Sequence, residues 1–161
     1  MLLAIDPGNV QSAYTIISPE YRPMRAIKVD NFSALQDIGQ ITRDEKNIEN
    51  VAIEMVACYG MPVGREVFDT CVWIGRFTQV CLDAGVPVEY VYRKDVKLNL
   101  CGTPTAKDGN IRQALIDRFA RHDLRSGKGT KKNPDWFYGF AADMWAAYAV
   151  GVTYLDSKKG A

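Results

Sequence analysis

Short runs of hydrophobic residues, separated by turn residues, predict five strands. Residues 2–5 are continuously apolar and stop at Asp6-Pro7-Gly8, as a buried central strand does when it enters a turn. Two further runs, at about 12–18 and 24–32, are separated by Pro19 and Pro23, so we expect the chain to open as an antiparallel meander. Later strands are expected at residues 51–56 and 88–92.

Two helices are predicted between these strands. Leu35, Ile38 and Ile41 lie at helical spacing in an otherwise polar stretch, which indicates a surface helix over residues 33–47. Apolar residues recur at helical intervals from Gly64 to Ala84, where Gly85-Val86-Pro87 ends the segment. Trp73 and Phe77 widen the apolar face of this second helix, which fits either core packing or a dimer interface.

Two more helices are predicted near the end of the chain. Thr105-Ala106-Lys107-Asp108 has the spacing of a capping box before the stripe formed by Ile111, Leu115 and Phe119. After a polar loop at 121–132, Asn133-Pro134 is expected to start a largely apolar helix that runs to about Leu155. The predicted order is three strands, helix, strand, helix, strand, helix, helix, which indicates an α/β fold.

The size and composition favour one domain over residues 1–161, since 47% of the residues are hydrophobic and can form a sizeable core. Lys and Arg total 20 against 19 Asp and Glu, so the net charge of +1 gives no global argument for a nucleic-acid partner. The four cysteines are irregularly spaced and indicate reduced thiols. With no signal or membrane segment, we expect a soluble cytoplasmic protein without a membrane partner.

Three acids stand where burial makes a carboxylate costly. Asp6 and Glu54 end buried strands, and Asp143 is the only residue between Phe140 and Val152 that is charged at neutral pH. A lone acid at a strand end is usually solvated, but a charge inside an apolar helix needs a counter-charge. If the first and fourth strands are parallel neighbours and the last helix packs across them, the three carboxylates converge with few cations nearby.

Divalent metal ions would resolve the repulsion among these carboxylates. Oxygen ligands suit Mg²⁺ or Mn²⁺, and two such ions about 3.5–4 Å apart can activate water against a phosphodiester. Lys107 is expected in the first turn of its helix, where a cation is disfavoured. It either extends into solvent or contacts the scissile phosphate.

Local basic residues predict where a nucleic-acid backbone would bind. The loop before the last helix is expected to be flexible and to act either as a phosphate clamp or as an ordinary solvated surface. Tyr59, in a predicted loop after Glu54, is a candidate for stacking on an unpaired base. The DNA-binding candidates are Tyr59, Lys107, Arg118, Arg121, Arg125, Lys128, Lys131 and Lys132.

The chain resembles the RuvC-type crossover junction endodeoxyribonucleases of the RNase H-like superfamily. Four motifs carry the resemblance and occur in order along most of the chain. They are Leu3-Ala4-Ile5-Asp6-Pro7-Gly8, Val51-Ala52-Ile53-Glu54, the stretch from Leu100-Cys101-Gly102 to Thr105-Ala106-Lys107-Asp108, and Ala142-Asp143-Met144-Trp145-Ala146. Their order and spacing are more specific than any one of them.

The resemblance implies an RNase H-like fold with a five-stranded mixed sheet flanked by helices. It implies a homodimer that binds four-way junctions and makes symmetrical metal-dependent nicks that leave 5′-phosphates, in a bacterial or phage-infected bacterial cell. Asp6, Glu54 and Asp143 would bind two Mg²⁺ or Mn²⁺ ions, and Lys107 would assist at the phosphate. A small, divergent member of this kind fits a phage or prophage.

The chain departs from the family pattern at two positions. Phe140 stands where the family usually has a fourth Asp or His ligand, so either Asp135 substitutes or the site works with three carboxylates. Ala57 stands where the family commonly has an aromatic residue that helps to open the junction, a role left to Tyr59 or Met61.

Three other functions compete with a junction nuclease. An RNase H-like nuclease acting on RNA would share the acids, and a DNA-junction binding module would have kept the fold without the chemistry. The actin-like ATPase fold also opens with a strand and an Asp, but it needs a far longer chain.

Overall fold

The computed structural model describes residues 1–44 and 47–160 and is built on one mixed five-stranded sheet. The strand order is β3-β2-β1-β4-β5. β1 pairs antiparallel with β2, and β2 with β3, so the predicted opening meander is confirmed. β4 and β5 extend the sheet in parallel with β1. The strands are β1 (Leu2–Asp6), β2 (Gln11–Ile17), β3 (Pro23–Asp30), β4 (Asn50–Met55) and β5 (Val88–Tyr92).

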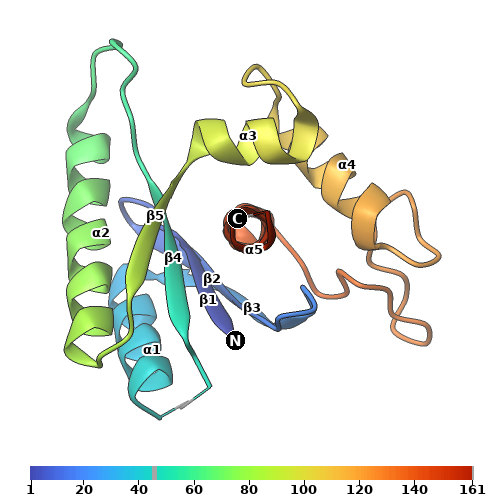
Figure 1. Cartoon of the computed structure of the whole chain (residues 1–161), viewed down its shortest axis with the longest axis horizontal. Helices are drawn as coiled ribbons and strands as arrows, with labels where there is room; N and C mark the ends of the chain where they lie inside the picture. The colour runs from blue at the N-terminus through green and yellow to red at the C-terminus, as the bar shows by residue number, and fades with distance from the viewer. Residues whose placement is uncertain (45–46, 161) are drawn as a thin grey trace.

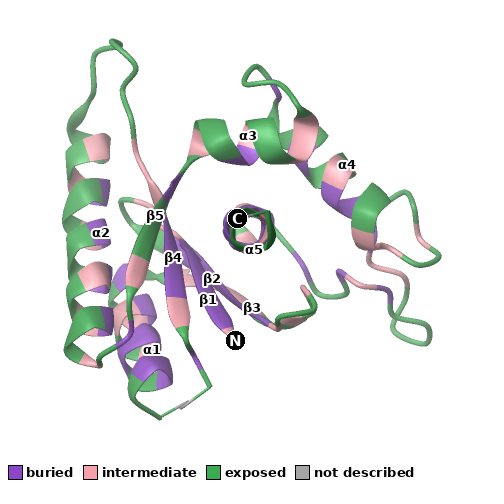
Figure 2. Ribbon diagram, viewed as in Figure 1, coloured by how far each residue is buried: buried purple, intermediate pink, exposed green. Residues whose placement is uncertain are grey.

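Helices cover both faces of the sheet (Figure 1). α1 (Asn31–Asp44) and α2 (Arg65–Asp83) lie together on one face, and α5 (Met144–Lys159) crosses the other. α3 (Arg93–Cys101) and α4 (Asp108–Phe119) pack beside α5. Each face has its own hydrophobic core, and β1 and β4 contribute buried side chains to both (Figure 2). The predicted α/β fold is therefore confirmed.

The close approach of α5 to the sheet depends on Gly151. A Cβ atom at this position would lie 2.3 Å from Cδ1 of Ile17 and 2.9 Å from Cβ of Ala4. Any side chain would therefore push α5 away from β1 and β2. This packing holds the middle of α5 against β1, which carries Asp6, and β2.

Two helices of the structure differ from the prediction. The last helix begins at Met144 rather than Asn133, because Gly139 and Ala142 adopt positive φ angles of 85° and 43° that no α-helix accommodates. α3 was missed, since only Val96 of its nine residues is buried and it shows almost no apolar stripe. Gly102, in the left-handed conformation that commonly ends helices, was the available signal for α3.

The other boundaries agree within a few residues. α4 begins at Asp108 with Lys107 as its N-cap, so Thr105 does not cap the helix as predicted. The predicted first helix extended to Asn47, but residues 45–46 lie outside the described part of the chain. The four cysteines are free thiols, as predicted. Among the described residues, no helix is long and apolar enough to cross a membrane.

The loop before α5 is tightly organised rather than flexible. The carboxylate of Asp135 accepts hydrogen bonds from the backbone N–H groups of Arg121, His122, Asp123 and Trp136. The carboxylate of Asp123 accepts others from Ser126, Lys128 and Gly129. Because backbone donors converge on two carboxylates, the loop has a defined shape.

Candidate active site

Asp6 and Glu54 stand side by side at the carboxyl ends of two central strands. β1 and β4 are parallel, and Ile5 pairs with Ile53, so the next residue in each strand is the acid. Gly8 makes the tight turn after Asp6 possible, because a Cβ atom there would lie 2.3 Å from the carbonyl oxygen of Gln11. The predicted parallel arrangement of the two acid-bearing strands is therefore confirmed.

Asp143 joins these acids from the N-cap position of α5. Its carbonyl oxygen accepts the first helical hydrogen bond from Ala147, and the preceding Ala142 has a φ of 43°, a left-handed conformation that is strained for a residue with a side chain. The carboxylate of Asp143 lies 2.5 Å from the ammonium of Lys28 on β3 and is half exposed. Burial of Asp143 inside a helix was therefore a wrong prediction, because the helix begins one residue later.

Two cations of the chain already balance these acids, contrary to the prediction that few would be nearby. Lys28 pairs with Asp143, and the guanidinium of Arg93 lies 3.6 Å from the carboxylate of Glu54. Arg93 also forms an ion pair with Asp108 at the start of α4. Arg93 therefore links the ends of β4 and β5 to the head of the α4 helix.

Burial and mutual repulsion perturb the two strand-end acids. Burial raises the pKa of Asp6, and the neighbouring charges of Glu54 and Asp143 raise it further. Burial also raises the pKa of Glu54, although the positive charge of Arg93 opposes that rise. Two neighbouring carboxylates repel each other when both are ionised. Additional positive charge in the site would stabilise their ionised forms.

The donor set fits a hard divalent cation. Three carboxylates supply only oxygen, which Mg²⁺ and Mn²⁺ prefer, and the perturbed pair favours a bound cation. Within the described residues, no three metal-ligating side chains are close enough to hold an ion as they stand. Asp143 is half exposed and pairs with Lys28 in this arrangement.

Lys107 lies beside this site rather than in it. It is exposed at the N-cap of α4, one residue before the Asp108 that pairs with Arg93. Its backbone N–H donates to the side chain of Asn110. Within the described residues its ammonium forms no ion pair with the acids, and its role at a phosphate stays a prediction.

Asp135 and Phe140, the proposed substitute ligand and the residue at the fourth-ligand position, both make structural contacts. Asp135 has a side chain with no exposed surface, and both of its oxygens accept backbone hydrogen bonds. Phe140 is buried in an aromatic cluster with Phe137, Trp145 and Tyr148. The suggestion that Asp135 replaces the missing ligand is therefore not supported, because its carboxylate is needed by the loop.

The predicted DNA-binding residues divide into two groups. Arg118 makes structural contacts, since its guanidinium donates two hydrogen bonds to Asp156 and packs over the ring of Tyr21. It is therefore a poor candidate for a free phosphate ligand. The remaining loop cations form no side-chain ion pair within the described residues, and all but Lys128, which is half-buried, are exposed. They are Arg121, Arg125, Lys128, Lys131 and Lys132.

Tyr59 lies on the rim of the hollow that contains the acids. Asp6, Glu54 and Arg93 line this hollow together with apolar residues of the segment after β4. Tyr59 is 62% exposed and has a φ of 46°, so its backbone adopts a left-handed conformation that is uncommon for a residue with a side chain. Met61, the other candidate of this loop, is 69% exposed.

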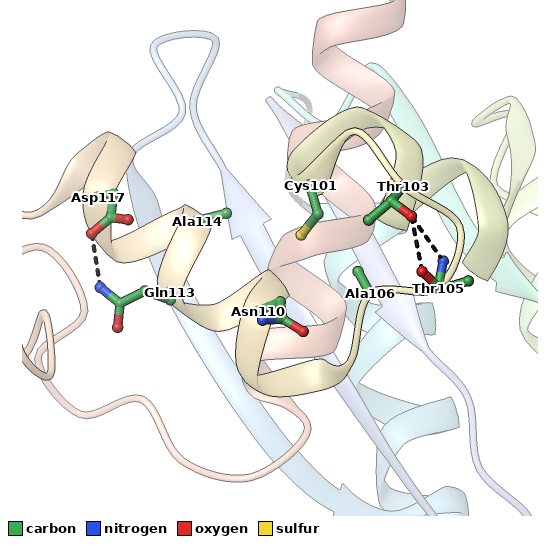
Figure 3. A pocket seen from close by; sticks show the side chains of 8 residues that line it. All are labelled: Cys101, Thr103, Thr105, Ala106, Asn110, Gln113, Ala114 and Asp117. Atoms are coloured by element: carbon green, nitrogen blue, oxygen red, sulfur yellow. Dashed lines mark hydrogen bonds between the residues drawn. The ribbon is translucent and has the colours of Figure 1, made fainter.

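Another hollow, between the end of α3 and the face of α4, has a different character (Figure 3). Cys101, Thr103 and Asn110 line it, and its only charged lining residue, Asp117, accepts a hydrogen bond from Gln113. It contains none of the predicted site residues. Asp6 and Glu54 line the hollow at the end of the sheet instead.

Sequence reasoning missed Lys28, Arg93 and Asp108 as parts of the site. Arg93 directly follows a predicted strand, as Asp6 does, and that position was the available signal. Lys28 carries no such signal, because it lies within β3 and reaches Asp143 only through the tertiary fold.

No protein-family model matches the sequence, and a search of curated proteins finds no match. Solved structures do match. The RuvC structure of Thermus thermophilus is 18% identical, with a TM-score of 0.67 over 99% of this chain and 96% of that one. The T. thermophilus RuvC complex with a Holliday junction substrate is 16% identical, with a TM-score of 0.71 over 99% of this chain and 95% of that one.

A Fowlpox virus resolvase in complex with Holliday junction DNA matches more loosely. It is 14% identical, with a TM-score of 0.47 over 98% of this chain and 99% of that one, which is too weak to support even the fold. The two Thermus matches establish that the chain has the fold of RuvC. The predicted RNase H-like fold is confirmed.

Proposed function

We propose that the chain is a structure-selective endonuclease that hydrolyses phosphodiesters in Holliday junctions and related branched DNA. The observation that carries the proposal is the convergence of Asp6, Glu54 and Asp143 at one end of a sheet with the RuvC fold. The solved T. thermophilus RuvC complex contains a Holliday junction substrate, which supports this choice of DNA.

The residues of the chain have distinct roles in this proposal. Asp6, Glu54 and Asp143 hold the metal ions, and Lys107 contacts the scissile phosphate, where it stabilises negative charge or protonates the leaving oxygen. Two Mg²⁺ or Mn²⁺ ions held by these carboxylates would supply the Lewis-acid chemistry that activates water and stabilises the leaving oxygen. Lys28 and Arg93 neutralise the acids and keep them in place before the ions bind.

Cleavage of a labelled four-way junction, beside a linear duplex of the same sequence, tests the proposal. The wild type should nick the junction in pairs with Mg²⁺ or Mn²⁺ and leave the duplex intact. Asp6→Asn should abolish cleavage but keep junction binding, because the change removes one metal ligand without altering its shape. No cleavage by the wild type with either ion would exclude the nuclease.

Two alternative functions have their own outcomes in this assay. Junction binding without cleavage would identify a binding module, which the buried Phe140 at the fourth-ligand position favours. Cleavage of an RNA strand in preference to the junction would identify an RNA-directed nuclease of the same fold. Both substrates belong in one experiment with one protein preparation.

Paired nicks need two active sites, so we propose a homodimer that works in the cytoplasm of a bacterial or phage-infected bacterial cell. α2 has apolar side chains available for the contact, because Phe68 and Val72 are 60% and 61% exposed. Sedimentation of wild type and Phe68→Glu tests the dimer. A monomeric wild type that still makes paired nicks would refute it.

A further inference from the structure

A second hollow adjoins the acid-containing one and has the opposite charge. It is lined by Tyr59, Arg93, Lys94, Lys97 and Pro104. Tyr59 and Arg93 line both hollows, so the two are neighbours at the same end of the sheet. In Figure 1, α3 leaves the end of β5 beside the end of β4, from which the loop with Tyr59 departs.

The cations of this hollow are clustered in a way that weakens α3. Lys94 and Lys97 are three residues apart, and Arg93 and Lys97 four apart, so like charges face one another on one side of the helix. Arg93 and Lys94 also occupy the first turn, where the helix dipole disfavours cations. Local stability therefore does not explain this arrangement.

Lys94 and Lys97 also lack the counter-charges that such a cluster needs. Arg93 is balanced by Glu54 and Asp108, but within the described residues neither lysine forms an ion pair. Asp95, which lies between them, pairs with neither. Two uncompensated ammonium groups thus line the hollow that adjoins the acid-containing one.

An aromatic ring completes the hollow. Tyr59 is largely exposed and is held there by a left-handed backbone followed by Gly60, whose φ is 84°. An exposed ring beside unpaired cations offers a stacking surface for a base and charges for its phosphate. A phosphodiester chain supplies both groups together.

We propose that Lys94 and Lys97, with Tyr59, form a binding site for a nucleotide that adjoins the scissile phosphate. The lysines contact its phosphate, and the Tyr59 ring packs against its base. This inference rests on the proposed function and adds α3 to the DNA-binding surface. It predicts that the strand runs from the acidic hollow across α3.

Junction binding by a Lys94→Gln/Lys97→Gln variant tests this site. Both this variant and its reference carry Asp6→Asn so that no DNA is cut, and fluorescence anisotropy is followed as salt increases. Loss of this phosphate contact should reduce the slope of log K against log salt by about 0.9. The variant should therefore bind roughly 8-fold more weakly at 0.1 M salt, with the difference vanishing near 1 M.

A matched control and a modified substrate localise the effect. Lys158→Gln/Lys159→Gln removes the same charge at the other end of α5, about 24 Å from Asp143, and should leave affinity nearly unchanged. Replacing a phosphate beside the cut site by a neutral methylphosphonate should weaken wild-type binding. The same replacement should have little further effect on the lysine variant, because the contact is already lost.

The outcomes separate this inference from the proposed function. If the wild-type enzyme cuts junctions while the lysine variant keeps the reference affinity and salt slope, the nucleotide site is refuted and the nuclease stands. An equal methylphosphonate penalty in variant and reference would also refute it. If the reference protein binds no DNA, both proposals fall.

Discussion

Replacing Asp135 by Asn should destabilise the protein without changing the proposed metal site. The side chain has no exposed surface. Its Oδ1 accepts from the N–H groups of Arg121 at 2.9 Å and Trp136 at 2.7 Å, and its Oδ2 accepts from His122 at 2.9 Å and Asp123 at 2.7 Å. Asn has nearly the same shape, but its amide nitrogen would face N–H donors wherever it is placed.

The magnitude follows from the groups left without acceptors. At least one backbone donor is stranded, at about 1–3 kcal/mol, and the surviving bonds to a neutral oxygen are about half as strong as those to a carboxylate. We therefore expect a loss of about 2–4 kcal/mol in the free energy of unfolding. For a protein of this size, that corresponds to a fall in Tm of roughly 4–16 °C.

Thermal and urea unfolding measure this loss, and calorimetric titration with Mg²⁺ measures metal affinity at a temperature where both proteins are folded. Asp83→Asn, which removes the same charge from an exposed position at the end of α2, is the matched control and should unfold like the wild type. Wild-type stability of Asp135→Asn with weakened Mg²⁺ binding would refute this reasoning and make Asp135 the fourth ligand.

Three further predictions follow from the packing and the charges. Asp6→Asn should abolish cleavage and, in EDTA at alkaline pH, raise the Tm. Burial and the charge of Glu54 raise the folded-state pKa of Asp6, so the wild type loses stability as pH rises from the ordinary carboxyl range through that raised pKa. An equal wild-type Tm at pH 5 and pH 9 would contradict this prediction. Burial alone would raise the pKa of Asp156, but hydrogen bonds from Arg118, Asn99 and Tyr21 lower it to about 2. The stability that this carboxylate contributes is present above the unfolded pKa of about 3.9 and is lost as pH falls through about 2. Urea unfolding should therefore show that Asp156→Asn is less stable than the wild type at pH 7, by a difference that shrinks in acid. A difference that stays constant with pH would refute this role of Asp156. Gly151→Ala should cost about 1–3 kcal/mol of unfolding free energy, because the added methyl group meets Ile17 and Ala4, and unchanged urea unfolding would mean that α5 moves freely.

Local patterns were sufficient to predict the strands and helices in which buried residues recur at a regular spacing. β1, which ends at Asp6, and β4, which carries Glu54 one residue before its end, are buried on both faces, so their apolar runs and their acids were visible before any fold was known. β5 and α2 were predicted within one residue, because each has a regular apolar pattern and a clear stop. That reasoning also identified the acids that the fold brings together.

Long-range contacts decided what local patterns did not reveal. Lys28 on β3 and Arg93 after β5 neutralise acids that are far away in the sequence, and no spacing rule connects such partners. In the sequence, Asp135 was a candidate for a metal ligand, as the other acids were, but the fold surrounds its carboxylate with backbone N–H donors. The start of α5 at Met144 likewise follows from positive φ angles at Gly139 and Ala142, and the preceding segment packs Phe137 and Phe140 against each other. Periodicity and side-chain chemistry are properties of neighbouring residues and can be predicted from the sequence, whereas a counter-charge or an acceptor is a relation between distant residues that exists only after the chain folds.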